Sequence, residues 1–476
     1  GWNQDSFTDE KRFPTNRDLD AVTTEYPILV MRTCFHVGSM NSKAMELLGI
    51  NKDTVGQYGD YAECWPDGTP NGVVKEIVLD DIKCNLPAPS LEQLLEKMIE
   101  CQTDLFESGI TSIQSDDFKY FPDGGAYDMM ERIRKASDKG IFKLRMAEQA
   151  LMYSLEEMET FFDQYGWDDS FGNRSFKIAC IKLLADGSLG ARTAYLRKPY
   201  ADDPSTRGLL LFPAEQLKEM VMKAHRNNMA VAIHAIGDGA VEKTMDCYQE
   251  AFIDGKNKLR HALVHCQITD EGLIQRIVDQ DILVMAQPIF LGYDMKIVDK
   301  VCGEELASTS YAFGTLLRKG AHLSYGSDCP VESCNPFWNI YQAVTRKDMD
   351  GNPEGGFRVH EAVDVETAID AYTLESAYAE FEEDKKGRIK AGMYADLLIL
   401  DTDIFTCDPM DIKDILPVLT MVGGKIVLAS LSDFGLSPKE SDCTLRLSFD
   451  ASLTDDQIAS VGQAFAEGIG RLAKMR

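Results

Sequence analysis

From residue 91 onward, short apolar runs alternate with stretches in which hydrophobic residues recur at helical spacing. The apolar runs predict seven strands, at Ile110–Gln114, Phe142–Ala147, Phe176–Leu184, Met229–His234, Ala262–His265, Ile282–Gln287 and His322–Gly326. The helical patterns lie between and after them, at Tyr127–Lys139, Leu155–Tyr165, Pro213–Asn227, Gly239–Phe252, Glu271–Asp279, Ser310–Lys319 and Pro336–Lys347. Because strands that alternate with helices pair in parallel, this order predicts an α/β fold, a (β/α)8 barrel of the TIM type. Seven strands are one fewer than a closed barrel needs, and the missing strand would be the first.

Residues 1–90 do not follow this alternation. They are rich in Asp, Asn, Gly and Pro, and they predict one short strand, Ile28–Arg32, and one helix, Ser42–Leu48. A cluster of turn-forming residues follows at 67–72. We therefore expect an insertion or lid in this segment, and the barrel domain itself in residues 91–380.

The C-terminal part of the chain predicts two further units. Residues 381–430 hold two strand patterns, Ala395–Leu400 and Val422–Val427, the second around Gly423-Gly424, which are expected to form part of a small β-sandwich. Residues 431–476 predict an appended strand, Cys443–Phe449, and an amphipathic helix, Thr454–Met475.

Charge and cysteine usage narrow the class of function. The net charge of −28 argues against a nucleic-acid partner or an anionic membrane, since both would be repelled. No apolar run reaches the roughly 18 residues of a membrane-spanning helix. The twelve cysteines are scattered without a CxxC pair, which favours reduced thiols in a cytoplasmic protein. A small-molecule substrate fits this composition, and the sequence leaves room for a homo-oligomer.

Four polar residues stand at or near the ends of predicted strands. Lys182 lies inside an apolar strand, where a lysine is costly unless it is neutralised, paired or modified, although one at a strand end can also reach solvent. His234 and His265 end two strands, and Asp328 follows the last one. In a parallel barrel these ends open onto one face. Two imidazoles, a carboxylate and a potential lysine carbamate favour a divalent metal, with Zn2+ as the default ion. For either histidine alone, a core position is the alternative.

Several motifs carry a family resemblance that covers residues 1 to about 428. They are GWNQ at 1–4, RTCFHVGSMNSKAMELLGI at 32–50, IKLLADGSLGARTA at 181–194, VAIHAIGDGAV at 231–241, RHALVHCQ at 260–267, YGSDCPVESCNPFWNIYQAVTR at 325–346 and YTLESAYAEFEEDKKGRIKAGMYADLLILD at 372–401. With these motifs the chain resembles the amidohydrolase superfamily, and within it the amidohydrolase-3 branch that includes YtcJ-like proteins and N-substituted formamide deformylases.

The resemblance implies a metal-dependent hydrolase acting on an amide-type C–N bond, such as that of an N-substituted formamide. It implies that Lys182 is carboxylated and that His234 and His265 are the imidazole ligands of one or two divalent ions. Asp328 would be a ligand and would also take the proton from the attacking water. Arg192, Gln287 and His36 are assigned to substrate binding. Arg192 could equally bind a carboxylate inside the protein, and His36 could be structural.

One family motif is missing from this sequence. Family members carry a His-x-His pair on the first barrel strand, and none of the seven histidines here has that spacing. The absence agrees with the count of seven strands. The chain is therefore expected to begin after the first barrel strand, with an opening between the Ile110–Gln114 strand and the strand that leads to Asp328. Two interpretations remain: a fragment or truncated hydrolase, or a catalytically inactive protein that serves as a binding or scaffold module.

Overall fold

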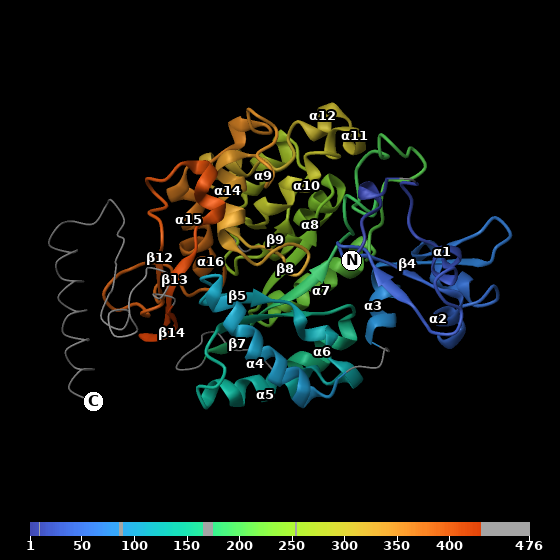
Figure 1. Cartoon of the computed structure of the whole chain (residues 1–476), viewed down its shortest axis with the longest axis horizontal. Helices are drawn as coiled ribbons and strands as arrows, with labels where there is room; N and C mark the ends of the chain where they lie inside the picture. The colour runs from blue at the N-terminus through green and yellow to red at the C-terminus, as the bar shows by residue number, and fades with distance from the viewer. Residues whose placement is uncertain (9, 85–88, 165–174, 253–254, 430–476) are drawn as a thin grey trace.

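The centre of the molecule is a parallel sheet of seven strands that curls in the manner of a TIM barrel (Figure 1). The computed structural model describes residues 1–8, 10–84, 89–164, 175–252 and 255–429. The strands pair in the order β11-β10-β9-β8-β7-β6-β5. All seven predicted strands are present, as β5 (Ser112–Ser115), β6 (Arg145–Leu151), β7 (Phe176–Leu184), β8 (Ala230–Ala235), β9 (Ala262–His265), β10 (Leu283–Ala286) and β11 (Leu323–Tyr325).

Helices connect these strands and cover the outer face of the sheet (Figure 1). The longer ones are α4 (Leu91–Glu107), α5 (Ala126–Asp138), α6 (Leu155–Gln164), α7 (Ala214–Arg226), α8 (Asp238–Ala251), α9 (Glu271–Asp279), α14 (Pro336–Thr345) and α15 (Val365–Tyr372). Shorter ones are α10 (Leu291–Asp294), α11 (Val298–Cys302), α12 (Glu304–Ala307), α13 (Phe313–Arg318) and α16 (Leu374–Ala379). The predicted helix at 310–319 thus begins three residues later. No helix in the described part of the chain is long and apolar enough to cross a membrane.

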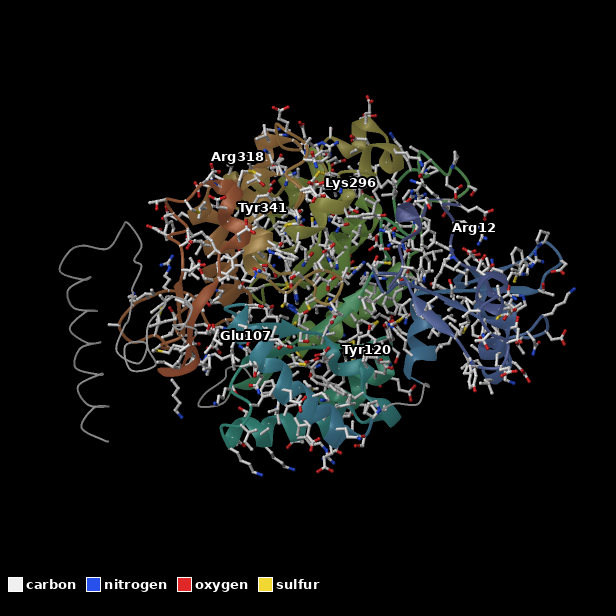
Figure 2. All side chains as sticks on the ribbon, viewed as in Figure 1. Arg12, Glu107, Tyr120, Lys296, Arg318 and Tyr341 are labelled. Atoms are coloured by element: carbon white, nitrogen blue, oxygen red, sulfur yellow. The ribbon has the colours of Figure 1, made fainter. Side chains whose placement is uncertain are left out.

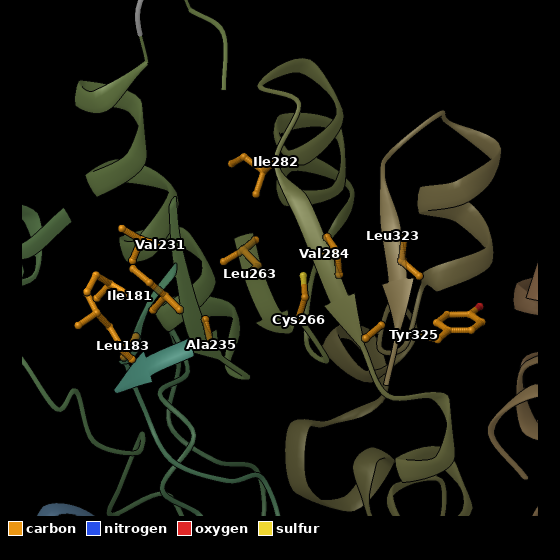
Figure 3. Packing of buried hydrophobic residues seen from close by; sticks show 14 of the residues in the cluster. Ile181, Leu183, Val231, Ala235, Leu263, Cys266, Ile282, Val284, Leu323 and Tyr325 are labelled. Carbon is orange, nitrogen blue, oxygen red and sulfur yellow. The ribbon is translucent and has the colours of Figure 1, made fainter. Parts of the chain in front are cut away.

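Side chains on the strands alternate between two environments. Ile181 and Leu183 of β7 and Val231 of β8 belong to the main apolar core between sheet and helices (Figure 3). Residues of the opposite parity form a second cluster in which small side chains predominate, Cys180, Ala230, Ala232, Ala262, Val264 and Leu283. Because side chains on a strand alternate between its two faces, Lys182 and His234 share the face of this second cluster.

The two edge strands of the sheet, β5 and β11, each pair on one side only in the described residues. The opening predicted between them is therefore present, and residues 10–84 contribute no strand to this sheet.

The N-terminal segment instead forms its own antiparallel sheet, in the order β1-β2-β4-β3 (Figure 1). Its strands are β1 (Leu29–Met31), β2 (Val37–Met40), β3 (Ala62–Cys64) and β4 (Pro70–Lys75). The expectation of a single strand here was wrong, because glycines such as Gly38 and Gly72 interrupt the apolar pattern of β2 and β4. The helices are α1 (Asn16–Asp20), α2 (Ser42–Leu47) and α3 (Glu76–Cys84). Exposed ion pairs such as Arg12–Asp18, at 2.7 Å, lie on its surface (Figure 2).

A third sheet lies at the C-terminal end of the described chain. It is antiparallel, in the order β12-β13-β14, with β12 (Leu397–Leu400), β13 (Pro417–Val422) and β14 (Lys425–Ala429). The predicted strand Val422–Val427 is in fact a hairpin, because Gly423 and Gly424 both have positive φ, 57° and 75°, as a two-residue turn requires. The sheet contacts the barrel through Thr420, whose Oγ1 donates to the Phe106 carbonyl at 2.7 Å. The strand and helix predicted in 431–476 lie outside the described residues.

Candidate active site at the carboxyl ends of the strands

Lys182 is held by a carboxylate from the end of another strand. It is nearly buried, and its Nζ lies 2.9 Å from Oδ2 of Asp116, the residue that follows β5. The Asp116 side chain is 41% exposed, so one end of this ion pair is open to solvent. Burial alone would lower the pKa of Lys182, but Asp116 and Asp328 outweigh it and raise the pKa. The lysine is thus a paired ammonium group near the surface of the site.

His265 departs from the alternation of its strand. By parity it would share the outward face with Leu263, but its φ of 73° lies in the left-handed region and redirects the side chain. Its ring stands edge-on to that of His234, with 4.5 Å between ring centroids. Such backbone conformations cost free energy and cluster at functional sites.

Gln287 fixes the tautomer of His265. The Nδ1 atom of His265 lies 2.7 Å from Oε1 of Gln287, while Nε2 of Gln287 donates to the Met285 carbonyl at 3.1 Å. The second bond sets the orientation of the amide, so Oε1 must accept and His265 Nδ1 must carry the proton. Burial lowers the pKa of His265 to about 3, with Lys182 adding to the effect. His265 is therefore neutral, with a lone pair on Nε2.

His234 is fixed in the complementary tautomer. Its Nε2 lies 3.1 Å from the Gly187 carbonyl, so that nitrogen carries the proton and Nδ1 keeps a lone pair. Burial, with the nearby His265 and His36, lowers the pKa of His234 well below its usual value. The loop after β7 that supplies this carbonyl is held by Asp186, whose carboxylate accepts from the Ile236 and Gly237 amides at 3.0 and 2.9 Å.

Asp328 lies three residues beyond β11, with a φ of 57°. Its side chain is reached by solvent, although protein atoms surround it closely enough to raise its pKa to about 6. The positive charges of Lys182 and His36 oppose that rise, whereas Asp116 adds to it. Asp328 therefore shares its electrostatic surroundings with Lys182, Asp116 and His36.

His36 reaches the same place from the N-terminal segment. Its ring centroid is 5.1 Å from that of His234, and its Nδ1 lies 2.7 Å from Oε2 of the buried Glu76. Burial alone would lower the pKa of His36, but Glu76 outweighs it and raises the pKa to about 9. Glu76 also packs against the loop after β7, because a Cβ at Gly187 would lie 2.1 Å from its Oε1. The N-terminal segment is thus fitted directly onto the strand ends.

Arg192 is the predicted site residue that lies apart from this group. Its Nη2 lies 2.7 Å from Oδ2 of Asp202, and its Nη1 donates to the Gly190 carbonyl at 2.9 Å. These contacts match the alternative stated for it, an internal ion pair. A role in substrate binding stays a prediction.

Three residues that the sequence did not single out belong to the site: Asp116, Glu76 and Asp186. Asp116 could have been found, because it lies two residues after a predicted strand, as Asp328 does. Glu76 could not, since nothing in the sequence brings residue 76 next to His36. Asp186 was visible only as part of a turn.

The donor atoms suit a divalent ion only in part. The two neutral imidazoles offer lone pairs, and Asp328 offers a carboxylate, all of which are common metal ligands. Lys182 in its ammonium form has no lone pair to offer. Among the described residues, no group of three or more His, Cys, Asp or Glu side chains is arranged as a ready metal site.

Comparisons with known proteins place the chain in one family. The model of the Amidohydrolase family matches residues 1–428. The protein YtcJ of Bacillus subtilis (strain 168) is 31% identical over 430 residues, covering 90% of this chain and 78% of that protein. The N-substituted formamide deformylase of Arthrobacter pascens is 23% identical over 429 residues, covering 87% of this chain and 76% of the enzyme.

A solved structure agrees with the sequence relatives. An uncharacterized metal-dependent hydrolase from Pyrococcus horikoshii OT3 superposes with a TM-score of 0.66 at 26% identity, covering 86% of this chain and 77% of the other. The curled parallel sheet and the match along nine-tenths of the sequence lead to one conclusion: the chain belongs to the amidohydrolase family, in its amidohydrolase-3 branch.

Proposed function

We propose that this protein is a divalent-metal-dependent hydrolase that cleaves the amide-type C–N bond of a small substrate, of the class of N-substituted formamides. In the reaction a C–O bond to water forms, the C–N bond breaks, and an acid and an amine leave. The observation that carries the proposal is the pair of neutral histidines, His234 and His265, each with its tautomer fixed by a separate partner.

Fixed tautomers are what metal ligation requires. In metal sites, the nitrogen that does not bind the ion donates to a carbonyl, carboxylate or amide, which orients the ring. The Gly187 carbonyl and the Gln287 amide take these positions here. His265 Nε2 and His234 Nδ1 are the nitrogens left to bind an ion, and Zn2+ is the ion we propose. Lys182 would join them as a carbamate.

Asp328 is the proposed general base. A bound divalent ion supplies polarisation of the carbonyl and lowers the pKa of water towards ~7. The Asp328 carboxylate is open to solvent and can accept the proton of the attacking water and return it to the leaving nitrogen. Lys182 and Asp116 lie close enough to influence its charge.

His36 is the proposed substrate-binding group, and its ring lies 5.1 Å from that of His234 between centroids. Glu76 binds its Nδ1, which leaves Nε2 to hold a polar atom of the substrate. Gln287 is assigned first to holding His265, because both ends of its amide are already bonded inside the protein. Its contact with substrate stays a prediction.

The test has two independent measurements. Metal analysis after incubation with Zn2+ and bicarbonate should give about one or two equivalents per chain. Incubation with a series of N-alkyl and N-aryl formamides should then release formate and amine in equal amounts. Formate release should fall in Asp328→Asn. The matched control is Asp350→Asn, at an exposed aspartate in the loop after α14.

The outcomes separate the parts of the proposal. Metal binding without formate release would contradict the substrate class and leave the site standing. Formate release without any dependence on metal would contradict the metal assignment. A chain that neither binds metal nor hydrolyses any member of the series would contradict the proposed function as a whole.

A further inference from the structure

A fully buried carboxylate, that of Asp186, joins the loops that follow β7 and β8. Its Oδ2 accepts from the Tyr195 amide at 2.8 Å and from the Gly237 amide at 2.9 Å, and its Oδ1 accepts from the Ile236 amide at 3.0 Å. Tyr195 belongs to the loop after β7, whereas Ile236 and Gly237 follow β8. One side chain thus connects the carboxyl ends of two neighbouring strands.

The backbone around Asp186 is closely packed. A Cβ at Gly237 would lie 2.1 Å from the Tyr195 carbonyl oxygen, so only glycine fits there. The same carbonyl accepts from the Gly239 and Ala240 amides of α8, both at 3.1 Å. The loop after β7 is therefore fixed against the start of α8, and the position of the Asp186 carboxylate is set by backbone atoms.

This carboxylate also faces the ring of His234. His234 Nε2 lies 3.4 Å from Oδ1 of Asp186 and 3.1 Å from the Gly187 carbonyl oxygen. Both oxygens are acceptors, and Oδ1 is held as one because it takes the Ile236 amide proton. A lone pair on Nε2 would oppose two electron-rich oxygens, so this nitrogen carries the proton. The ring is 4% exposed, which leaves water little access to either contact.

We propose that Asp186 is a positioning residue that fixes the tautomer of His234 and thereby leaves Nδ1 free to bind a divalent ion. It acts through the oxygen that faces Nε2 and through the backbone bonds that hold the loop carrying the Gly187 carbonyl. The inference rests on the proposed function, in which His234 is a metal ligand. Loss of a partner that orients a ligand without touching the ion commonly lowers metal affinity about 10- to 100-fold.

Asp186→Asn tests this role because it replaces one acceptor oxygen by an NH2 group. In the place of Oδ2 this group would oppose the Tyr195 and Gly237 amides, whereas in the place of Oδ1 it opposes only the Ile236 amide. The second orientation loses one backbone hydrogen bond instead of two and is therefore favoured. The NH2 group then points at His234 Nε2 and donates to it, which favours the tautomer with the proton on Nδ1.

The tautomer is measured on the metal-free full chain by long-range proton–nitrogen NMR after labelling of the histidine rings. Protonated and unprotonated ring nitrogens have well separated shifts, and the sequence holds only seven histidines. The signal that is missing from His234→Gln identifies His234. We expect the proton on Nε2 in the parent and a populated Nδ1–H form in Asp186→Asn. Competition with a chromophoric chelator should give a Zn2+ affinity about 10- to 100-fold lower in Asp186→Asn.

Glu361→Gln is the matched control. Glu361 is also a buried carboxylate bonded to a backbone amide, with its Oε2 2.7 Å from the Thr315 nitrogen, but it packs on α13. Its replacement should lower the melting temperature without changing the His234 signals or the affinity for Zn2+. A merely structural role of Asp186 would give the same result as this control.

Either of two results would overturn the proposal. One is a parent whose His234 carries the proton on Nδ1, a measurement that requires no variant to fold. The other is a folded Asp186→Asn in which His234 keeps the proton on Nε2, whatever its affinity for Zn2+. Neither measurement involves hydrolysis. A chain that cleaves no formamide would leave the tautomer result standing, and an unchanged tautomer would leave the proposed hydrolase activity untouched.

Discussion

Two lysines five residues apart on the same strand, β7, show how the two ends of the sheet differ. Lys177, at the amino end, is 1% exposed and donates to the Glu380 carbonyl at 2.7 Å, with Glu382 Oε1 at 3.2 Å. Glu382 is itself fully buried. Lys182, at the carboxyl end, is nearly as buried, but its partner Asp116 is 41% exposed.

The difference lies in the partner, because both lysines are withdrawn from water. When a buried carboxylate pairs with a buried ammonium group, both charged groups are shielded from solvent, and neither can contact a ligand. A carboxylate that is open to solvent keeps the lysine within reach of small molecules such as CO2 or substrate. In barrels of this type, the amino-end face carries stability and the carboxyl-end face carries the chemistry. Both lysines are buried, so the solvent exposure of the paired carboxylate is what distinguishes the stabilising Lys177 from Lys182 at the candidate site.

The largest effect is expected at the carboxyl-end face. Asp328→Asn should lower kcat by about 10^2 to 10^4, the range for loss of a general base, while the melting temperature stays within a few degrees. The small thermal effect follows because Asp328 is solvent-exposed and lies beyond the strand. Steady-state kinetics on the substrate found in the formamide series, with calorimetry, measure both. A variant that melts much lower but keeps its activity per folded molecule would make Asp328 structural.

The next prediction compares two variants, in each of which one of the two lysines of β7 is replaced by methionine. Lys177→Met should destabilise the fold by about 3–5 kcal/mol, because it removes a fully buried ammonium group from Glu382, a fully buried carboxylate that also pairs with the partly exposed Lys385. Lys182→Met should cost only about 1 kcal/mol, because water can solvate Asp116. Urea unfolding measures both. Activity per folded molecule should show the reverse order, retained in Lys177→Met and lost in Lys182→Met. Equal losses of stability would remove the distinction between the two faces.

The sequence predicted the barrel strands well because each is an apolar run with helical patterns on either side. The same reasoning placed His234 and Lys182 together, because the ends of the strands in a parallel barrel open onto one face. His265 was placed correctly at a strand end, but its direction depends on a left-handed φ of 73° that no pattern of residue types reveals.

The N-terminal segment and the C-terminal hairpin show where the pattern fails. The β2 and β4 strands are short and contain glycines, so their pairing depends on contacts made after the chain has folded. The Glu76–His36 pair joins residues 40 positions apart, and only the antiparallel pairing of β2 with β4 brings them together. Long-range pairing of this kind cannot be derived from local periodicity.

A smaller effect is expected from the residue that orients His265. Gln287→Leu removes the acceptor for His265 Nδ1 and frees the ring to adopt the other tautomer, so Zn2+ affinity should fall about 10- to 100-fold. Gln287→Glu keeps an acceptor oxygen and should restore most of the affinity. Competition with a chromophoric chelator measures both variants without a substrate. Equal affinity in the parent and the leucine variant would mean that His265 does not bind metal.

The smallest effect concerns the amino-end face, where His322 precedes β11 and its Nδ1 lies 2.8 Å from Glu375 Oε2. The hydrogen bond from Glu375, with its negative charge, raises the pKa of His322 above its usual value despite partial burial. Since the folded pKa is the higher one, the stabilisation is fully present below about pH 6.5 and is lost as pH rises through the folded pKa. The pair is partly exposed, so its contribution should be under about 1 kcal/mol.

His322→Gln also removes the ring stacked on Tyr378, but that loss does not vary with pH. The difference in unfolding free energy between parent and variant should therefore shrink from pH 5.5 to pH 9. Glu375→Gln should abolish the same pH dependence, and neither variant should change kcat. A change in turnover would contradict the assignment of this face to stability alone.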